Sequence, residues 1–288
     1  MRERTPFPRE LIERLPHLKL LLSCGRHNKA IDMEACQSRG IPVTGSEDKM
    51  ATETTLEHII TLILGACHDI AQNDAAVKAG KWQTSLVIGV TGKTLGIIGL
   101  GRLGRSVARI FSTAFGMRII CWSANLTQST ADEQARSQGL SVDGPGGEKT
   151  FKVVSRDELF STADVVSVHL LLSDRTRGLI TREDLSKMKP SSFFVNTSRG
   201  QLVDEEDLLG ILRAGKIKGA ALDVFNLEPL PADCEWRRSD WGTNGKSRVL
   251  VTPHIAFVEE SVMNGFYEQQ VGELLRWSRG EALKNTMY

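Results

Sequence analysis

The stretch Thr94-Leu-Gly-Ile-Ile-Gly99-Leu-Gly101-Arg-Leu-Gly104 decides the fold class of this chain. It begins with an apolar run, passes through Gly99, Gly101 and Gly104 in GxGxxG spacing, and leads into a helical pattern. The first glycine permits a tight turn, the second lets the backbone approach a pyrophosphate, and the third lets the helix pack closely on the strand. The stretch therefore predicts a dinucleotide site at a helix N-terminus, where N–H groups and the helix dipole favour phosphate.

Strand and helix patterns alternate along the rest of the chain. Short apolar runs predict further strands over 18–24, 41–44, 117–122, 165–170, 193–196, 219–224 and 249–252. Helical spacing of apolar residues predicts helices over 10–15, 28–38, 52–71, 102–115, 182–188, 205–213 and 259–280. Such alternation indicates a parallel sheet with helices on both faces, so the sequence predicts an α/β fold.

The composition is that of an ordinary globular chain. Of the 288 residues, 41% are hydrophobic and 25% are charged, and 36 basic against 35 acidic residues leave a net charge of +1. This balance gives no electrostatic reason to expect nucleic acid or an anionic membrane as a partner. The longest apolar run, over 59–67, is far shorter than the ~20 residues of a membrane span, and the charged, proline-containing N-terminus does not read as a signal peptide.

The cysteine pattern indicates reduced thiols. The five cysteines, at positions 24, 36, 67, 121 and 234, are odd in number and lack the spacing of a zinc site. We therefore expect core cysteines and no bound metal, in a protein of the cytoplasm.

The predicted strand over 117–122, the next one after the glycine stretch, bears on the choice of coenzyme. Dinucleotide sites of this type usually carry an acidic residue at its end, about 20 residues after the glycines, to bind the adenosine ribose. Here Ser123 stands at that place, and no carboxylate lies beside it. The absence of a carboxylate removes a barrier to a 2′-phosphate, but no arginine follows until Arg136. Because Ser123 and Asn125 can hydrogen-bond either form, NAD and NADP both stay open.

Three further motifs follow in order: Val195-Asn-Thr-Ser-Arg199-Gly200, Ala221-Leu-Asp223-Val-Phe-Asn-Leu-Glu228-Pro229 and Thr252-Pro-His254-Ile-Ala256. Together with the glycine stretch they resemble the D-isomer-specific 2-hydroxyacid dehydrogenase family, over nearly the whole chain. The resemblance implies an NAD(P)-dependent oxidoreductase that interconverts a D-2-hydroxy acid and its 2-oxo acid by hydride transfer.

The resemblance assigns the catalytic set to Arg199, Glu228 and His254. The chemistry suits these residue types. A planar guanidinium can hold the carboxylate of a 2-oxo acid and polarise the adjacent carbonyl. An imidazole can give a proton to the carbonyl oxygen as the hydride arrives, and a carboxylate on its far nitrogen would favour the protonated form. Glu228 also speaks against formate dehydrogenase in the same broad group, where a neutral Gln replaces the Glu.

The resemblance also implies the binding residues. It places coenzyme contacts at Gly99, Gly101, Arg102, Leu103, Gly104, Ser123, Asn125, Leu170, Leu171, Thr176, Thr197, Asp223, His254 and Ala256. It places substrate contacts at Gly25, Arg26, Arg199 and His254. Within this set, Asp223 would accept a hydrogen bond from the nicotinamide carboxamide. Leu170 and Leu171 depart mildly from the family pattern, in which many members carry proline.

The resemblance further implies the domain organisation. We expect a Rossmann-type doubly wound parallel sheet over 83–255 and a smaller flavodoxin-like α/β substrate domain over 1–82. Residues 256–288 would return as a helix to the substrate domain. The front segment offers only two clear strands, so we expect a substrate domain shortened at its N-terminus. The long helix from Thr52 would support a homodimer, and its His58 and His68 read as packing or surface residues.

Two alternative functions stay open at this stage. The same fold serves an NAD(H)-sensing corepressor-like binding protein, whose subgroup can keep the catalytic set. A truncated, inactive paralogue would also carry these motifs. The partner expected in the main interpretation is a small 2-oxo or 2-hydroxy acid.

Overall fold

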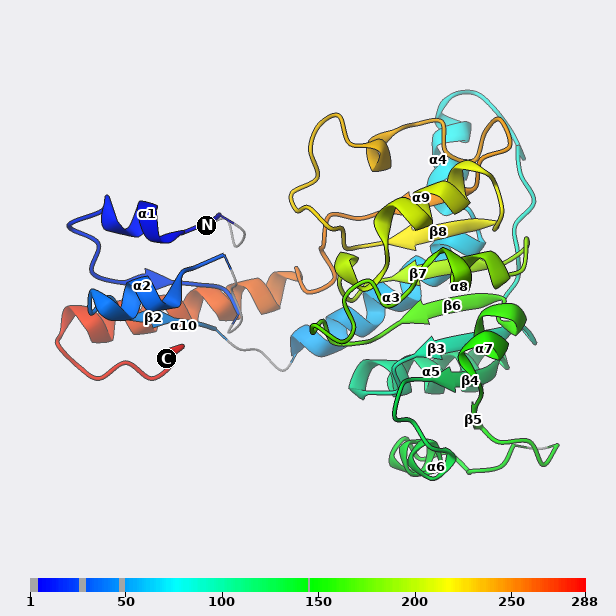
Figure 1. Ribbon diagram of the computed structural model, residues 1–288, viewed down its shortest axis with the longest axis horizontal. Helices are drawn as coiled ribbons and strands as arrows, with labels where there is room; N and C mark the ends of the chain where they lie inside the picture. Colours follow the sequence, from blue (N-terminus) through cyan, green and yellow to red (C-terminus); the bar gives the residue numbers. More distant parts are fainter. Residues whose placement is uncertain (1–4, 26–29, 47–49, 145) are drawn as a thin grey trace. The chain divides into compact units, whose positions relative to one another are not determined.

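A computed structural model describes residues 5–25, 30–46, 50–144 and 146–288. The chain divides into two compact units (Figure 1). We call residues 55–256 the sheet unit, and residues 1–54 together with 257–288 the front unit.

The sheet unit is built on seven parallel strands in the order β5-β4-β3-β6-β7-β8-β9. The strands are β3 (Thr94–Ile98), β4 (Arg118–Trp122), β5 (Phe151–Val153), β6 (Val165–Val168), β7 (Phe193–Asn196), β8 (Gly219–Leu222) and β9 (Arg248–Val251). The chain runs outward from β3 to β5 and then returns to β6 on the other side of β3. This reversal marks the switch point where such sheets bind ligands beyond the carboxyl ends of their strands. The predicted doubly wound α/β fold is confirmed.

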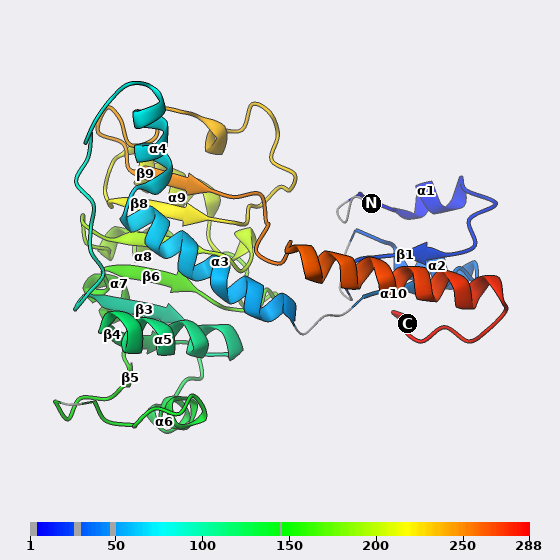
Figure 2. The ribbon, with the colours of Figure 1, turned by 180° about the vertical axis from the view of Figure 1, so that it is seen from behind.

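Helices cover both faces of this sheet (Figures 1 and 2). They are α3 (Met50–Cys67), α4 (Ile70–Lys78), α5 (Arg102–Phe115), α6 (Gln128–Ser137), α7 (Arg156–Thr162), α8 (Arg182–Lys187) and α9 (Glu205–Arg213). Neighbouring strand residues point to opposite faces of the sheet. Ile97 accordingly belongs to a buried cluster that includes residues of α3 and α5, and Ile98 belongs to the other cluster, with residues of α7, α8 and α9. Among the described residues, no helix has both the length and the apolar character to cross a membrane.

The boundary between the two units lies earlier than the sequence analysis placed it. Residues 55–82 were expected in the substrate domain, but the structure groups them with the sheet. The reason is the apolar face of α3, where Ile59 and Ile63 are fully buried in the same core as Ile97. The apolar face of α3 is buried by packing in the core of the seven-stranded sheet, so most of the helix belongs to the sheet unit.

Several elements of the sheet unit were not predicted. The polar stretch 123–164 contains α6, β5 and α7, none of which shows a clear apolar period. In α6 only Ala131 and Ala135 are buried, and these small side chains give a weak signal. Likewise α4 has no buried residue and begins after Asp69, which adopts a left-handed backbone. The predicted single helix over 52–71 is therefore two helices.

The front unit contains a small parallel sheet of two strands. Its elements are α1 (Arg9–Glu13), β1 (Leu21–Leu22), α2 (Met33–Ser38), β2 (Val43–Thr44) and α10 (Glu260–Ser278). Leu21 pairs with Val43, and Ile12, Cys36 and Val43 are buried in one cluster. The segment after α10 returns to β2, where the Met287 N–H donates to the carbonyl oxygen of Val43 at 2.9 Å. The C-terminal segment is thus part of this unit.

Among the described residues the five cysteines form no disulfide, and four of them are buried. Burial raises the pKa of the Cys67 thiol to about 12, and it raises the pKa of Cys121 still further. A thiol held in its neutral form behaves as a small apolar side chain, so these cysteines serve the core, as expected.

Candidate active site

The glycine turn after β3 combines close packing with one open space. Gly99 has φ +96°, and a Cβ there would lie 2.9 Å from the carbonyl oxygen of His169. At Gly104 a Cβ would lie 2.1 Å from the oxygen of Gly99, so α5 packs directly on the turn. At Gly101 a Cβ would meet nothing within 4 Å. Space is therefore left in front of the first N–H groups of α5, at Arg102 and Leu103, and this arrangement fits a pyrophosphate.

The next strand end has no acidic group. Ser123 follows β4 directly, and the Leu126 N–H donates to its carbonyl oxygen at 3.1 Å, forming a turn that includes the exposed Asn125. The guanidinium of Arg156 stacks over the ring of Trp122, the last residue of the strand, at 5.2 Å from the ring centroid. Ser123 and Asn125 therefore offer neutral hydrogen-bonding groups at this strand end, beside the guanidinium of Arg156.

Thr197 presents a buried hydroxyl directly after β7. Its side chain is 8% exposed, and Oγ1 has no hydrogen-bond partner among the described residues. A buried hydroxyl without a partner is costly, and such groups mark places where a ligand completes the bonding. The unpartnered Thr197 hydroxyl and the open space at Gly101 both fit a bound dinucleotide.

The loop after β6 is closed by its own threonine. Thr176 Oγ1 donates to the carbonyl oxygen of Leu171 at 2.7 Å and accepts from the Ser173 N–H at 2.8 Å. Leu171 is 88% exposed, while Leu170 packs against the core and lies beside Gly99. These residues therefore border the glycine turn from the neighbouring strand.

Glu228 and His254 form a carboxylate–imidazole pair. Glu228 Oε2 lies 2.8 Å from His254 Nδ1, and Glu228 Oε1 accepts from the Phe225 N–H at 2.8 Å. The two side chains are 14% and 15% exposed. Because the second oxygen is tied to backbone, the carboxylate has a fixed direction and orients the ring.

Arg199 sits on a loop that packs against the loop of Glu228. The guanidinium is exposed, and its Nη1 donates to the carbonyl oxygen of Ser198 at 2.6 Å. A Cβ on Gly200 would lie 2.1 Å from the carbonyl carbon of Phe225, so the two backbones touch. Gln201 Nε2 adds a hydrogen bond of 2.9 Å to the oxygen of Asn226. The loop after β7, which carries Arg199, and the loop after β8, which carries Glu228, are therefore in direct contact.

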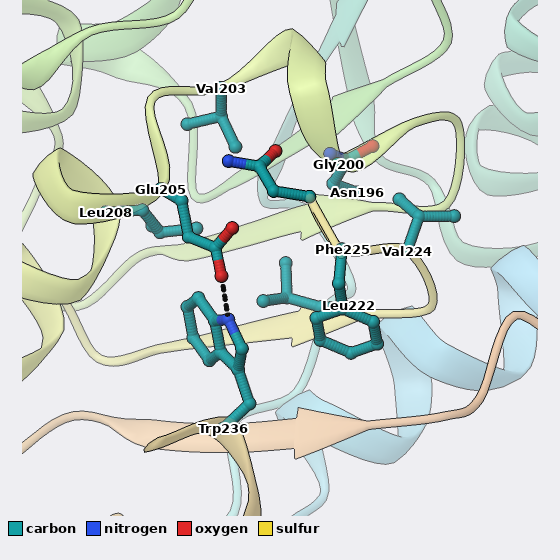
Figure 3. A pocket seen from close by; sticks show the side chains of 10 residues that line it. Asn196, Gly200, Val203, Glu205, Leu208, Leu222, Val224, Phe225 and Trp236 are labelled. Atoms are coloured by element: carbon teal, nitrogen blue, oxygen red, sulfur yellow. Dashed lines mark hydrogen bonds between the residues drawn. The ribbon is translucent and has the colours of Figure 1, made fainter. Parts of the chain in front are cut away.

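Figure 3 shows the apolar support beneath these loops. A small pocket there is lined by Gly200, Phe225 and Trp236, among others. The indole Nε1 of Trp236 donates to Glu205 Oε1 at 2.6 Å, and its ring lies 6.1 Å from that of Phe225. This packing holds the loop that carries Glu228 against α9.

Asp223 holds the turn that carries His254. Its Oδ1 accepts from Thr252 Oγ1 at 2.5 Å and from the Ile255 N–H at 3.0 Å, and its Oδ2 accepts from the Ala256 N–H at 3.2 Å. The side chain is fully buried. Burial alone would raise the pKa of Asp223, but hydrogen bonds from His58 and Thr252 outweigh it and hold the pKa below its ordinary value. The expected contact with a coenzyme carboxamide stays a prediction.

The expected substrate residues of the front unit are only partly described. Gly25 follows β1 with φ +76°, a left-handed conformation that glycine adopts without strain. Arg26 lies outside the described residues. Of the expected substrate contacts, the structure therefore describes Arg199 and His254 in the sheet unit and Gly25 in the front unit.

Two residues that the sequence did not single out form hydrogen bonds with the loops of the candidate site. Asn196 bonds the loop of Arg199 twice, from Nδ2 to the Arg199 oxygen at 2.9 Å and from the Ser198 N–H to Oδ1 at 3.1 Å. His58 was expected to be a packing or surface residue, but its Nε2 lies 3.1 Å from Thr252 Oγ1. Asn196 lies inside the motif Val195–Gly200, so its position offered a signal. His58 has its partner 194 residues away, which leaves no local pattern in the sequence.

Comparison with known proteins places this geometry in a family. Residues 60–256 match the family model of the D-isomer specific 2-hydroxyacid dehydrogenase, NAD binding domain. A hydroxypyruvate reductase of Blautia hydrogenotrophica is 28% identical over 96% of this chain and 81% of its own length. A glyoxylate reductase of Korarchaeum cryptofilum is 32% identical over 97% and 79%. The crystal structure of a phosphoglycerate oxidoreductase from Vibrio cholerae superposes with a TM-score of 0.81, at 31% identity over 97% of this chain and 82% of that one. The chain belongs to the D-isomer specific 2-hydroxyacid dehydrogenase family.

Proposed function

We propose that this enzyme reduces a small 2-oxo acid to the D-2-hydroxy acid with a nicotinamide coenzyme, and catalyses the reverse oxidation. The observation that carries the proposal is the pair of Glu228 and His254, with atoms 2.8 Å apart, at the carboxyl end of a sheet whose glycine turn fits a dinucleotide. The bound nicotinamide supplies or accepts the hydride.

Arg199 is the proposed anchor of the substrate. A 2-oxo acid presents a carboxylate and a carbonyl in one plane, and the planar fork of a guanidinium can bond both. The Arg199 side chain is exposed and turned onto its own loop, where it donates to Ser198. Exchange of this local bond for two charge-assisted bonds to a carboxylate would draw it to the substrate.

His254 is the proposed proton donor of the reduction. With Nδ1 bonded to Glu228, the proton that reaches the substrate carbonyl oxygen is the one on Nε2. The adjacent carboxylate stabilises the imidazolium that this step requires. In the oxidation direction the neutral ring takes the hydroxyl proton at the same nitrogen.

The coenzyme and the substrate are proposed only as classes. Ser123 and Asn125 can hydrogen-bond a ribose hydroxyl or a phosphate oxygen, so we propose NADH and NADPH as the two coenzymes to compare. The named activities of the relatives make hydroxypyruvate and glyoxylate the first substrates to test on this chain.

The proposed assembly is a homodimer in the cytoplasm. Large apolar side chains stand exposed on α4 and on the segment after it, namely Ile70, Val77, Trp82, Leu86 and Val87. Apolar side chains grouped in this way are typical of contact surfaces between proteins. Five cysteines that form no disulfide among the described residues fit a reducing compartment. Light scattering that finds only monomer would contradict the dimer.

The test is oxidation of NADH and of NADPH against a panel of 2-oxo acids. We expect turnover with the wild-type chain and loss of it in His254→Ala, with coenzyme affinity kept. The control is Arg118→Lys, an exposed position at the start of β4, which should behave as wild type. Coenzyme binding without any turnover would contradict the proposal and favour an NAD(H)-sensing protein. Absence of coenzyme binding would favour an inactive paralogue.

A further inference from the structure

A histidine on α3 reaches the turn that carries His254. His58 Nε2 lies 3.1 Å from Thr252 Oγ1 and 3.4 Å from Asp223 Oδ1, and the His58 side chain is 18% exposed. All three residues belong to the sheet unit. The contact joins a helix near the start of the chain to a turn 194 residues later.

The donors and acceptors of this cluster have one consistent arrangement. The Asp223 carboxylate can only accept, so the Thr252 hydroxyl donates its proton to Oδ1 at 2.5 Å. The same hydroxyl then accepts from His58, whose Nε2 must carry a proton. The order of donation runs from His58 through Thr252 to Asp223, and each bond polarises the next.

Asp223 forms hydrogen bonds with the turn on both sides of His254. Thr252 precedes His254 by two residues, and the N–H groups of Ile255 and Ala256, which follow it, donate to the Asp223 carboxylate. Between these attachments His254 has φ +53°, a left-handed conformation that is unfavourable for a residue with a Cβ. The attachments on either side therefore maintain a strained backbone that aims the ring at Glu228.

We propose that His58 is a positioning residue for His254, acting through Thr252 and Asp223. Its contacts are with Thr252 and Asp223, so its proposed role is to hold the turn that carries His254. Its N–H orients the Thr252 hydroxyl toward Asp223, and the carboxylate then holds the left-handed turn. The inference rests on the proposed function, because it assigns His58 to the proton donor of that reaction.

The test compares three variants of the full chain. His58→Leu removes the donor, His58→Gln places an amide N–H at a similar reach, and His68→Leu makes the same exchange just beyond the end of α3. We expect kcat for reduction to fall about tenfold in His58→Leu, the effect of one lost hydrogen bond to a charged network. KM and coenzyme affinity should stay within about twofold of wild type. His58→Gln should recover most of the loss, and His68→Leu should match wild type.

A second readout does not depend on turnover. NMR follows the ring protons of the six histidines through a pH titration, and the His254 signal is identified by its absence in His254→Gln. We expect His254 to lose its proton at a lower pH in His58→Leu, because the ring is no longer held at the Glu228 carboxylate. A role in packing alone would lower Tm without moving this titration.

The outcomes separate the two proposals. A chain that reduces none of the 2-oxo acids contradicts the proposed function, while the His254 titration still decides the role of His58. An unchanged titration and kcat in His58→Leu would overturn the positioning role, as would a His58→Gln variant no better than His58→Leu. The double variant His58→Leu/Thr252→Val should lose no more than Thr252→Val alone, since His58 is proposed to act through the Thr252 hydroxyl.

Discussion

Glu228 Oε2 and His254 Nδ1 lie 2.8 Å apart, and the other oxygen of Glu228 is tied to the backbone N–H of its own loop. The carboxylate is therefore a fixed acceptor, and the imidazole turns to it. Because Nδ1 is engaged, the other ring nitrogen is the one that can exchange a proton with a substrate. Glu228 therefore fixes the orientation of the His254 ring and favours its protonated form, which the proposed proton donor requires.

Exchange of Glu228 for glutamine should change the pH dependence of reduction. The neutral amide no longer stabilises the imidazolium, so His254 loses its proton at a lower pH. Reduction near neutral pH should fall about tenfold or more, and most of the loss should be recovered about one to two pH units lower. The measurement is kcat against pH for wild type and Glu228→Gln. Superimposable profiles would contradict the role of the carboxylate.

Replacement of Arg199 by lysine should weaken substrate binding although the positive charge is kept. An ammonium is a point charge without the planar fork, so one of two bonds to the 2-oxo acid is lost. We expect KM to rise about tenfold to a hundredfold, with coenzyme affinity unchanged. The matched exchange Arg118→Lys, at the opposite end of the sheet, should leave KM as it is. Equal KM values in both variants would remove Arg199 from the substrate site.

Two glycines of the turn should respond differently to alanine. Gly101 has φ −79°, which any residue adopts, and a Cβ there enters open space, so Gly101→Ala should fold as wild type. The new methyl group would occupy the expected pyrophosphate position, so NADH affinity should fall about tenfold or more. Gly104→Ala places its Cβ 2.1 Å from the oxygen of Gly99 and should destabilise the fold by about 1–3 kcal/mol. Thermal melts and NADH titrations distinguish the two effects.

The sequence predicted correctly the helices and strands in which apolar residues recur at regular spacing. The helix predicted over 102–115 and the strand over 193–196 have these same bounds in the structure, since both bury an apolar pattern in the main core. The helix α6 escaped prediction because its buried residues are only Ala131 and Ala135. The boundary at 54/55 escaped as well, because the apolar face of α3 does not say which sheet will cover it.

Most residues of the quoted motifs follow strand ends, and the carboxyl ends of parallel strands meet at one edge of the sheet. The functional roles assigned to these residues stay predictions. What the motifs did not contain is the hydrogen bonding between loops. Asp223 was assigned to a coenzyme contact from the resemblance alone, and the structure adds four donors around its carboxylate. The contribution of His58 depends on a contact across 194 residues, for which a single sequence has no local pattern.

Exchange of Thr197 for valine should separate stability from coenzyme binding. Its Oγ1 is buried without a partner among the residues that the structure describes, so removal of the hydroxyl should stabilise the free chain by about 1 kcal/mol. If the hydroxyl bonds the coenzyme, NADH affinity should fall about tenfold in the same variant. Thr44→Val is the matched control, because Thr44 Oγ1 in the front unit is orphaned in the same way. An unchanged NADH affinity in Thr197→Val would exclude this contact.

His169 should make the folded chain less stable in acid. Burial lowers its pKa from the model-peptide value of 6.5 to about 4, and its Nε2 lies 2.9 Å from Ser167 Oγ. Between these two values the unfolded chain binds a proton that the folded chain excludes, so stability is complete above about pH 6.5 and falls as the pH approaches 4. The loss attributable to His169 should reach about 2–3 kcal/mol, and His169→Gln, which cannot titrate but can still bond Ser167, should lack it. Urea unfolding of both proteins between these pH values measures the difference, and parallel curves would mean that the buried ring does not exclude the proton.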